Sequence, residues 1–251
     1  MTLTLSLDQA FSKANKFIKK GEIESALYIY KSVLQKFPKN FRALKAIKTL
    51  IPQSSVGDQN QLVDYYNRGQ FDEGISLSQK LIQKHPYDHF LYNFLGIFYN
   101  ALGNLQEAEK AYIQSLKINQ SVSDIWNNFS VNQFDLEKFE ESVRSCENAL
   151  KLEPKNAKAL NNLGNALLSL KKYNEALGAL KKSYDIDPHS FRTLNNLGNT
   201  CQKLSLYDQA ISYLQKGIEL NNQDDELYYN IAMAYRDTGQ FNKSYENFIN
   251  S

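Results

Sequence analysis

Large apolar residues recur along the chain with the spacing of an amphipathic helix, and the whole pattern repeats with a period of about 34 residues. The stretch from Leu160 to Asn165 reads LNNLGN, and the stretch from Leu194 to Asn199 has the same six letters. When the residues of each repeat unit are numbered from its first residue, apolar residues recur at positions 4, 7 and 11. Residues at these spacings lie on one stripe of a helix. The pattern therefore predicts an all-α fold in which pairs of helices repeat.

Proline and glycine mark the same period. Pro154 lies two periods after Pro86, and Pro188 lies one period after Pro154. Proline at position 32 breaks a helix before the next unit. Position 15 is often glycine, which suits a turn between two helices because glycine accepts a positive φ. These markers predict the units 7–40, 55–88, 89–122, 123–156, 157–190, 191–224 and 225–251.

A period of about 34 residues with these small and large positions is the signature of the tetratricopeptide repeat. The chain resembles that family over nearly its whole length, most clearly in NNLGNALLSLKKYNEALGALKKSYDIDP, which starts at Asn161, and in the unit after it. One helix pair cannot bury its apolar stripe alone, so neighbouring units must stack. The resemblance implies a right-handed α-solenoid of about seven helix-turn-helix units, the last one incomplete at Ser251.

One interruption suggests a domain boundary. The interval from Pro38 to Pro86 exceeds one period, and the surplus is the stretch 41–54. This stretch predicts an extra amphipathic helix that starts at Phe41, followed by the linker Ile51-Pro52-Gln53-Ser54-Ser55. We therefore expect an N-terminal module at 1–54 and a main solenoid at 55–251. A single continuous solenoid with a bulged connection is the alternative.

Composition excludes several classes of protein. The 251 residues are 42% hydrophobic and carry a net charge of +2, which supports a core but identifies no partner. No apolar run approaches the roughly 18 residues of a membrane helix, and no signal peptide is visible at the N-terminus. We expect a cytoplasmic protein without membrane insertion. Two cysteines are too few for a disulfide scaffold.

Charge is unevenly distributed along the chain. Residues 1–54 contain ten Lys and Arg against three Asp and Glu, whereas residues 55–156 have a net charge of −5. The basic module could contact an acidic partner, including the acidic middle of the same or another chain. Its lysines are spread between apolar residues and no aromatic-interleaved basic motif is present, so we expect no nucleic acid partner.

Residues suited to catalysis are scarce. His85, Asp88 and His89 form the only cluster with metal-ligand residue types, and Pro86 separates the two histidines, so we expect a solvated turn and no metal. No phosphate-binding loop, nucleophile elbow or zinc-protease motif is present. Cys146 and Cys201 occupy packing positions and are expected to be buried. The sequence therefore predicts no catalytic residue, no cofactor and no enzymatic activity.

Asparagines dominate the positions that line the concave groove in this family. The resemblance implies that positions 2, 5, 6, 9, 12 and 13 of each first helix point inward. An asparagine amide can bind a peptide bond through a donor and an acceptor, each contributing about 1 kcal/mol. The alternative is a general asparagine bias of the chain. The expected groove residues are Asn93, Asn127, Asn128, Asn161, Asn162, Asn165, Asn195, Asn196, Asn199 and Asn230, with Phe90 and Phe94 as a side-chain pocket and Lys158 and Arg192 as charged neighbours.

Two hypotheses for function follow. The asparagine row resembles the repeat region of O-linked N-acetylglucosamine transferases, and this implies a scaffold that binds an extended peptide or a partner helix. The alternative is the recognition region of a larger glycosyltransferase or sulfotransferase, because YYNRGQFDEGISLSQKLIQKHP resembles repeats that precede such domains. Chaperone-binding members of the family hold a C-terminal carboxylate with basic residues on the first helices. Those basic residues are missing here, so we expect no binding of this kind. A homodimer through the uncapped C-terminal helix is a further expectation.

Overall fold

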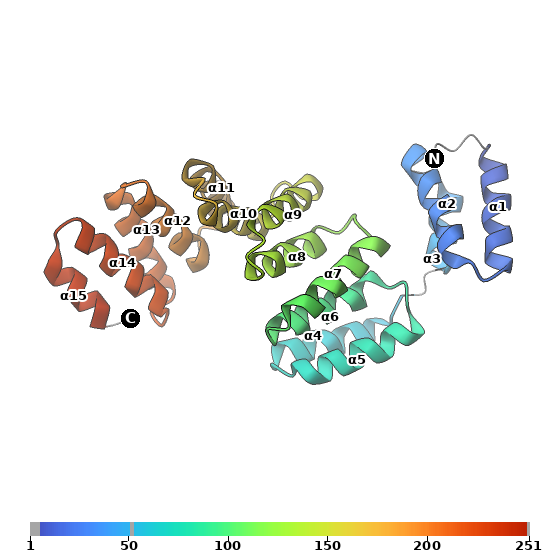
Figure 1. The fold of residues 1–251 in the computed structure, drawn as a ribbon, viewed down its shortest axis with the longest axis horizontal. Coiled ribbons are helices and arrows are strands. Elements are labelled where there is room, and N and C mark those ends of the chain that lie inside the picture. The colour runs from blue at the N-terminus through green and yellow to red at the C-terminus, as the bar shows by residue number, and fades with distance from the viewer. Residues whose placement is uncertain (1–5, 51–52, 250–251) are drawn as a thin grey trace. The chain divides into compact units, whose positions relative to one another are not determined.

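The computed structural model describes residues 6–50 and 53–249. Within these residues every regular element is an α-helix and no strand is present (Figure 1). The prediction of an all-α fold built from repeated helix pairs is confirmed. In chain order the helices are α1 (Leu7–Lys19), α2 (Ile23–Lys36), α3 (Phe41–Leu50), α4 (Val56–Asn67), α5 (Phe71–Lys84), α6 (His89–Ala101), α7 (Leu105–Ile118), α8 (Ser123–Asp135), α9 (Phe139–Leu152), α10 (Ala157–Ser169), α11 (Tyr173–Ile186), α12 (Phe191–Lys203), α13 (Tyr207–Leu220), α14 (Asp225–Asp237) and α15 (Phe241–Ile249).

The turn inside each helix pair has a left-handed residue at position 15. Gly21, Gly69, Gly103 and Gly239 adopt φ values from 68° to 76°, as the sequence predicted. The remaining units use Glu137, Lys171 and Ser205 at the same position, with φ of 59° or 60°. A left-handed conformation costs an ordinary residue about 1–2 kcal/mol. The geometry of the turn is therefore kept even where the sequence does not favour it.

Position 8 of the first helix packs against position 24 of the second. A Cβ added to Gly164 would lie 2.6 Å from Cδ2 of Leu180, which is closer than real Cβ contacts allow. In unit 123–156 the corresponding pair is Ser130 and Cys146, and both residues are buried. Serine is larger than the glycine at position 8 of unit 157–190, and cysteine is smaller than the leucine at position 24 of that unit. This complementarity fixes how closely the two helices of a unit approach.

The first turn of the extra helix α3 and of several first helices is capped by the residue at position 34 of the unit before. Asn40, Asn156, Ser190 and Asp224 each accept a hydrogen bond from the backbone N–H three residues later, at 3.0 to 3.3 Å. Such a side chain satisfies one of the N–H groups that a helix start leaves without a partner. The caps were not anticipated, although Asn, Ser and Asp directly before an apolar stripe are a recognisable signal.

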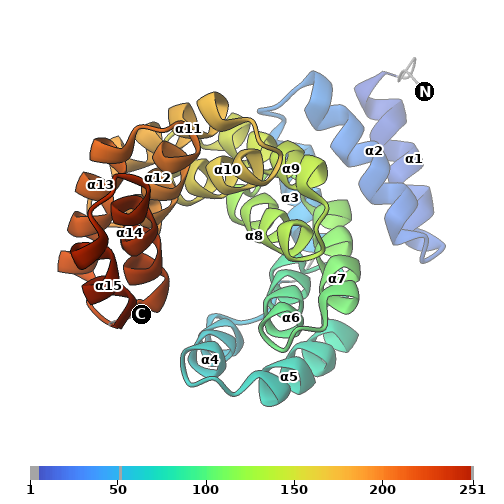
Figure 2. The same ribbon diagram turned by 60° about the vertical axis from the view of Figure 1, so that its left-hand side comes forward.

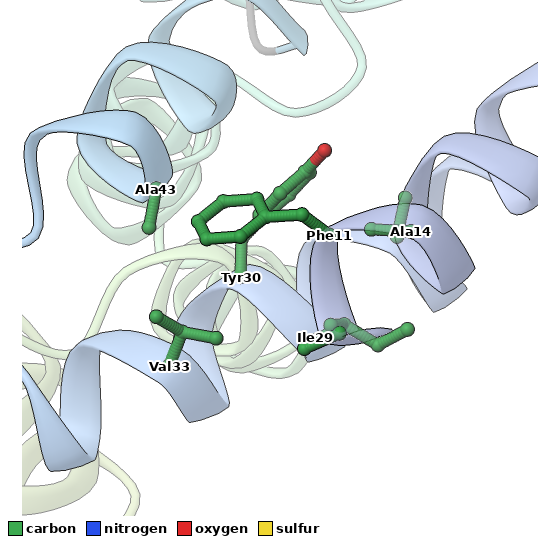
Figure 3. Packing of buried hydrophobic residues seen from close by; sticks show 8 residues of the cluster. Phe11, Ala14, Ile29, Tyr30, Val33 and Ala43 are labelled. Atoms are coloured by element: carbon green, nitrogen blue, oxygen red, sulfur yellow. The ribbon is translucent and has the colours of Figure 1, made fainter. Parts of the chain in front are cut away.

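The structure divides into two compact units, residues 1–91 and 92–251, which are described separately. In the first unit α1, α2 and α3 share one core, in which the rings of Phe11 and Tyr30 lie 5.5 Å apart and Ala43 of α3 is fully buried (Figure 3). The predicted extra helix is thus confirmed as α3. The expected domain boundary near residue 54 stays a prediction, and Ile51 and Pro52 of the expected linker lie outside the described residues.

In the second unit the helix pairs stack on one another. Helix α12 contacts its own partner α13 and also the first helices on either side, α10 and α14. Figure 2 shows α8, α10, α12 and α14 on the inner side of this curved stack and α9, α11 and α13 on its outer side. Between units, Leu214 of α13 packs with Leu227 and Ile231 of α14. Consecutive first helices therefore present one continuous face.

None of the helices within the described ranges combines the length and the apolar character that a membrane span requires.

Candidate functional site

The asparagines at positions 5 and 6 form a row of hydrogen bonds from α6 to α14. In every case Nδ2 at position 6 donates to Oδ1 at position 5 of the preceding unit, 35 residues earlier. We call these eight residues the asparagine ladder. Its bonds are Asn128 to Asn93 at 3.2 Å, Asn162 to Asn127 at 2.9 Å, Asn196 to Asn161 at 3.0 Å, and Asn230 to Asn195 at 2.8 Å.

The ladder arises because successive first helices lie against each other. Residues 35 positions apart lie on adjacent first helices at nearly the same level along the helix axes, so their side chains meet. Asn93, Asn127, Asn195 and Asn230 are buried, and the other four members are partly buried. A buried amide without a partner is costly, so these bonds also hold consecutive units together. The sequence interpretation treated each amide as free for a ligand and did not foresee this pairing.

Each ladder amide uses only one of its hydrogen-bonding groups in the ladder. Among the described residues, no hydrogen bond occupies Nδ2 of Asn127, Asn161 or Asn195, or Oδ1 of Asn162 or Asn196. Because all four bonds run in the same direction, each pair leaves a donor on its position-5 asparagine and an acceptor on its position-6 asparagine. A peptide group offers one acceptor and one donor, so the two sets are complementary.

Positions 2 and 9 extend the ladder along each helix by one turn, because residues three or four apart share a helix face. In α10 this gives Lys158 and Asn165, and in α12 it gives Arg192 and Asn199. Both cations are exposed, and both additional asparagines are partly exposed. We call the following set the first-helix face: Asp124, Asn127, Asn128, Val131, Lys158, Asn161, Asn162, Asn165, Arg192, Asn195, Asn196, Asn199, Glu226, Tyr229, Asn230 and Met233.

The two aromatic residues expected beside the ladder are both partly buried. The ring of Phe94 lies 5.8 Å from that of Phe98, in a tilted arrangement. The backbone N–H of Phe90 donates to Oδ1 of Asp88 at 3.0 Å. Phe90 belongs to the first unit and Phe94 to the second, and the side-chain pocket that they were expected to form stays a prediction.

Asp88, one of the three candidate metal ligands, has a structural role. Its carboxylate is fully buried and accepts hydrogen bonds of 2.7 Å from both the backbone N–H and the hydroxyl of Ser54. Together with the bond from Phe90, these contacts join the start of α6 to the residues just before α4. Within the described part of the chain, no three His, Cys, Asp or Glu side chains gather in a way that could hold a metal ion.

The two cysteines lie in the packed interior, as the sequence predicted. Cys146 and Cys201 are fully buried. Burial raises the pKa of the Cys146 thiol from 9.0 to about 11, and it also raises the pKa of Cys201. A thiol acts as a nucleophile only as the thiolate. At neutral pH both thiols therefore stay protonated and serve only to fill the packed interior.

Comparison with known proteins identifies the repeats. Tetratricopeptide repeat families match residues 91–124, 123–156, 156–223 and 225–249. Together these matches cover almost all of 91–249, the region that contains the asparagine ladder. No curated protein matches the chain significantly.

Solved structures with the same fold are distant in sequence. PilF of Pseudomonas aeruginosa is 16% identical with a TM-score of 0.67, over 76% of this chain and 87% of its own. MamA of Desulfovibrio magneticus RS-1 is 19% identical with a TM-score of 0.57, over 64% and 91%. YrrB, described as a TPR protein with an unusual peptide-binding site, is 18% identical with a TM-score of 0.55, over 69% and 89%. At these identities the likeness establishes the fold alone.

Proposed function

Since the chain belongs to the tetratricopeptide repeat family, we propose that it is a non-catalytic protein interaction scaffold whose first-helix face binds an extended peptide. The observation that carries the proposal is the unused half of the asparagine ladder. Each of the four successive pairs offers one donor and one acceptor, in the same orientation. That arrangement suits the main chain of a ligand and leaves its side chains free to vary.

The strength of such binding can be bounded. Two hydrogen bonds for each of the four pairs, at about 1 kcal/mol net each, give about 8 kcal/mol. Association costs at least about 4 kcal/mol in lost translational and rotational freedom. The ladder alone therefore supports only millimolar binding, and micromolar binding needs further contacts from neighbouring side chains. The charged residues at position 2 and the partly buried aromatics at the α6 end are the candidates for those contacts.

YrrB supports the proposal as a protein of the same fold that is described as having a peptide-binding site. The resemblance of the asparagine row to the repeat region of O-linked N-acetylglucosamine transferases also favours an extended ligand. The same face would serve equally well as the recognition region of a larger enzyme, and that alternative stays open. The cytoplasmic location and the homodimer through the C-terminal helix also stay predictions. Phe241, Tyr245 and Ile249 of α15, each at least 66% exposed, are the residues through which such a dimer would form.

The proposal is tested with an array of unstructured peptides of about 12 residues, a length that spans four units at about 3.3 Å per residue. The ladder variant carries Asn128→Ala, Asn162→Ala and Asn196→Ala. The matched control carries Asn148→Ala, Asn174→Ala and Asn242→Ala on the second helices α9, α11 and α15. We expect the control to keep the binding of wild type and the ladder variant to lose it.

A second measurement separates main-chain recognition from loss of folding. Each peptide that binds wild type is synthesised again with its backbone nitrogens methylated, which removes the donors without changing the side chains. We expect methylation to abolish binding to wild type, for which folding is not in question. Equal binding by methylated and unmethylated peptides, or by wild type and a folded ladder variant, would contradict the proposal.

A further inference from the structure

We propose that the first-helix face is selective for an extended peptide that carries two acidic side chains about three residues apart, bound over α10 and α12. This inference rests on the proposed peptide-binding function and adds the chemistry of the ligand. It comes from the order of charges along the ladder. Position 2 is occupied in turn by Asp124, Lys158, Arg192 and Glu226, all of them exposed.

These four charges lie on the same face as the ladder. Lys158 precedes Asn161 and Asn162 by three and four residues, and Arg192 stands in the same relation to Asn195 and Asn196. Residues at these spacings are neighbours on a helix surface. Because α8, α10, α12 and α14 follow one another along the inner side of the stack (Figure 2), the charges form a row beside the ladder. A ligand held by the ladder would lie within reach of this row.

The central two helices carry no carboxylate at all. Helix α10 contains a single charged residue, Lys158, and the charged residues of α12 are Arg192 and Lys203. The flanking helices are acidic: α8 carries Asp124 and Asp135, and α14 carries Asp225, Glu226 and Asp237 against Arg236. The face is therefore positive over α10 and α12 and negative on both sides. Charge complementarity of this kind selects partners and fixes their register.

The two central cations are available to a ligand. Among the described residues, neither Lys158 nor Arg192 makes an ion pair with a carboxylate of the chain. The guanidinium of Arg192 lies 5.8 Å from the ring centroid of Phe191, a contact that leaves its hydrogen-bond donors free. Both side chains are exposed, so no burial cost opposes their pairing with an incoming carboxylate.

The spacing of the acidic residues follows from the geometry of the stack. Adjacent packed helices lie about 8–10 Å apart. An extended peptide in the polyproline II conformation advances about 3.1 Å per residue with three residues per turn, so side chains three residues apart share one face and can lie above Lys158 and Arg192. Ladder asparagines continue on both sides, in α8 and in α14. The ligand therefore extends beyond both cations, and its acidic groups are internal side chains, with no need for a terminal carboxylate.

The test uses three fluorescein-labelled peptides of about 12 residues with blocked ends and a common Ser, Thr and Asn background. At two positions three residues apart they carry Glu, Gln or Lys. Fluorescence anisotropy measures binding to wild type, to the reversed variant with Lys158→Glu and Arg192→Glu, and to a control with Lys151→Glu and Lys182→Glu. The control makes the same change in charge at exposed residues of the second helices α9 and α11.

We expect wild type and the control to bind the Glu peptide about tenfold more tightly than the Gln peptide, and the Lys peptide most weakly. The reversed variant should invert this order, which mere loss of folding cannot do. If wild type binds all three peptides equally while the ladder variant loses them, this inference fails and the proposed function stands. If the Gln or Lys peptide binds wild type more tightly than the Glu peptide does, only this inference is wrong; if none of the three peptides binds, both are wrong.

Discussion

The side-chain amide of Asn230 donates a hydrogen bond of 2.8 Å to the side-chain oxygen of Asn195, and both residues are buried. The bond joins α12 and α14, which belong to consecutive units. Three further bonds of the same kind precede it along the chain. The ladder thus joins consecutive units through one group of each amide, and the remaining groups are the proposed contacts for a ligand.

Removal of one partner from the pair that Asn230 and Asn195 form should destabilise the stack. Asn230→Ala leaves the buried Oδ1 of Asn195 without its donor, and we expect the free energy of unfolding to fall by about 1–3 kcal/mol. Urea unfolding of Asn230→Ala, Asn195→Ala and the double variant gives the coupling energy, expected to be about 1 kcal/mol. Asn242→Ala, at an exposed site on α15, should change stability by less than about 0.5 kcal/mol. A coupling energy of zero would show that the bond does not stabilise the stack.

Gly164 cannot be enlarged without disturbing Leu180. The added Cβ of Gly164→Ala would lie 2.6 Å from Cδ2 of Leu180. We expect a net loss of about 1–2 kcal/mol in the free energy of unfolding, because overpacking outweighs the helix propensity gained by replacing glycine. Gly178→Ala is the control, since nothing lies within 4 Å of its added Cβ, and it should stabilise by up to about 1 kcal/mol. Chemical denaturation of both variants decides the sign of each effect.

Glycine at position 15 should stabilise the units that lack it. Lys171 adopts φ of 60°, and Lys171→Gly removes the steric cost of that conformation. We expect the free energy of unfolding to rise by about 1 kcal/mol, with Glu137→Gly and Ser205→Gly behaving alike. The reverse change, Gly103→Ala, should lower stability by a similar amount, because Gly103 adopts φ of 74°. Thermal unfolding measures all four variants, and destabilisation by the three glycine substitutions would contradict the turn geometry.

Alkaline pH should destabilise the protein through Cys146. Burial raises the pKa of this thiol from 9.0 to about 11 in the folded state, so in the interval between these values the unfolded chain loses a proton that the folded protein keeps. The contribution of the thiol to stability is therefore constant below the unfolded pKa and falls as the pH rises. Between about pH 8 and pH 10 the loss should be about 1 kcal/mol.

The variant Cys146→Ala isolates the effect of this group from that of other titrating residues, such as Cys201. We expect the stability difference between wild type and Cys146→Ala to shrink by that amount over the same pH interval in urea unfolding. A difference that stays constant with pH would mean that the folded state does not suppress ionisation of Cys146.

Features that repeat within one unit could be predicted from the sequence. The apolar stripes predicted the helices, and the glycines predicted the turns at Gly21, Gly69, Gly103 and Gly239. The same reasoning predicted the burial of Cys146 and Cys201. The caps at position 34 belong to this class too, because Asn, Ser or Asp directly before an apolar stripe is a local signal. All of these features depend on contacts inside one helix pair or at its ends, so the local sequence specifies them.

The candidate site could be predicted only in part. The row of asparagines is visible in the sequence, but the repeat period alone does not say which side chains of successive units meet. That depends on how one helix pair rotates and shifts against the next. In the structure, side chains 35 residues apart meet, as Asn161 and Asn196 do. The ladder is therefore a structural element as well as a candidate binding site.

The sequence by itself therefore determined the helices, the turns and the residue types available to the first-helix face. The tertiary structure decided how those residues are used. The sequence predicted a solvated turn at Asp88, but the fold buries this carboxylate as the acceptor for Ser54, and it pairs the asparagines of consecutive units. The physical reason is that the local periodicity specifies each helix pair, whereas contacts between pairs arise from the packing of complete units.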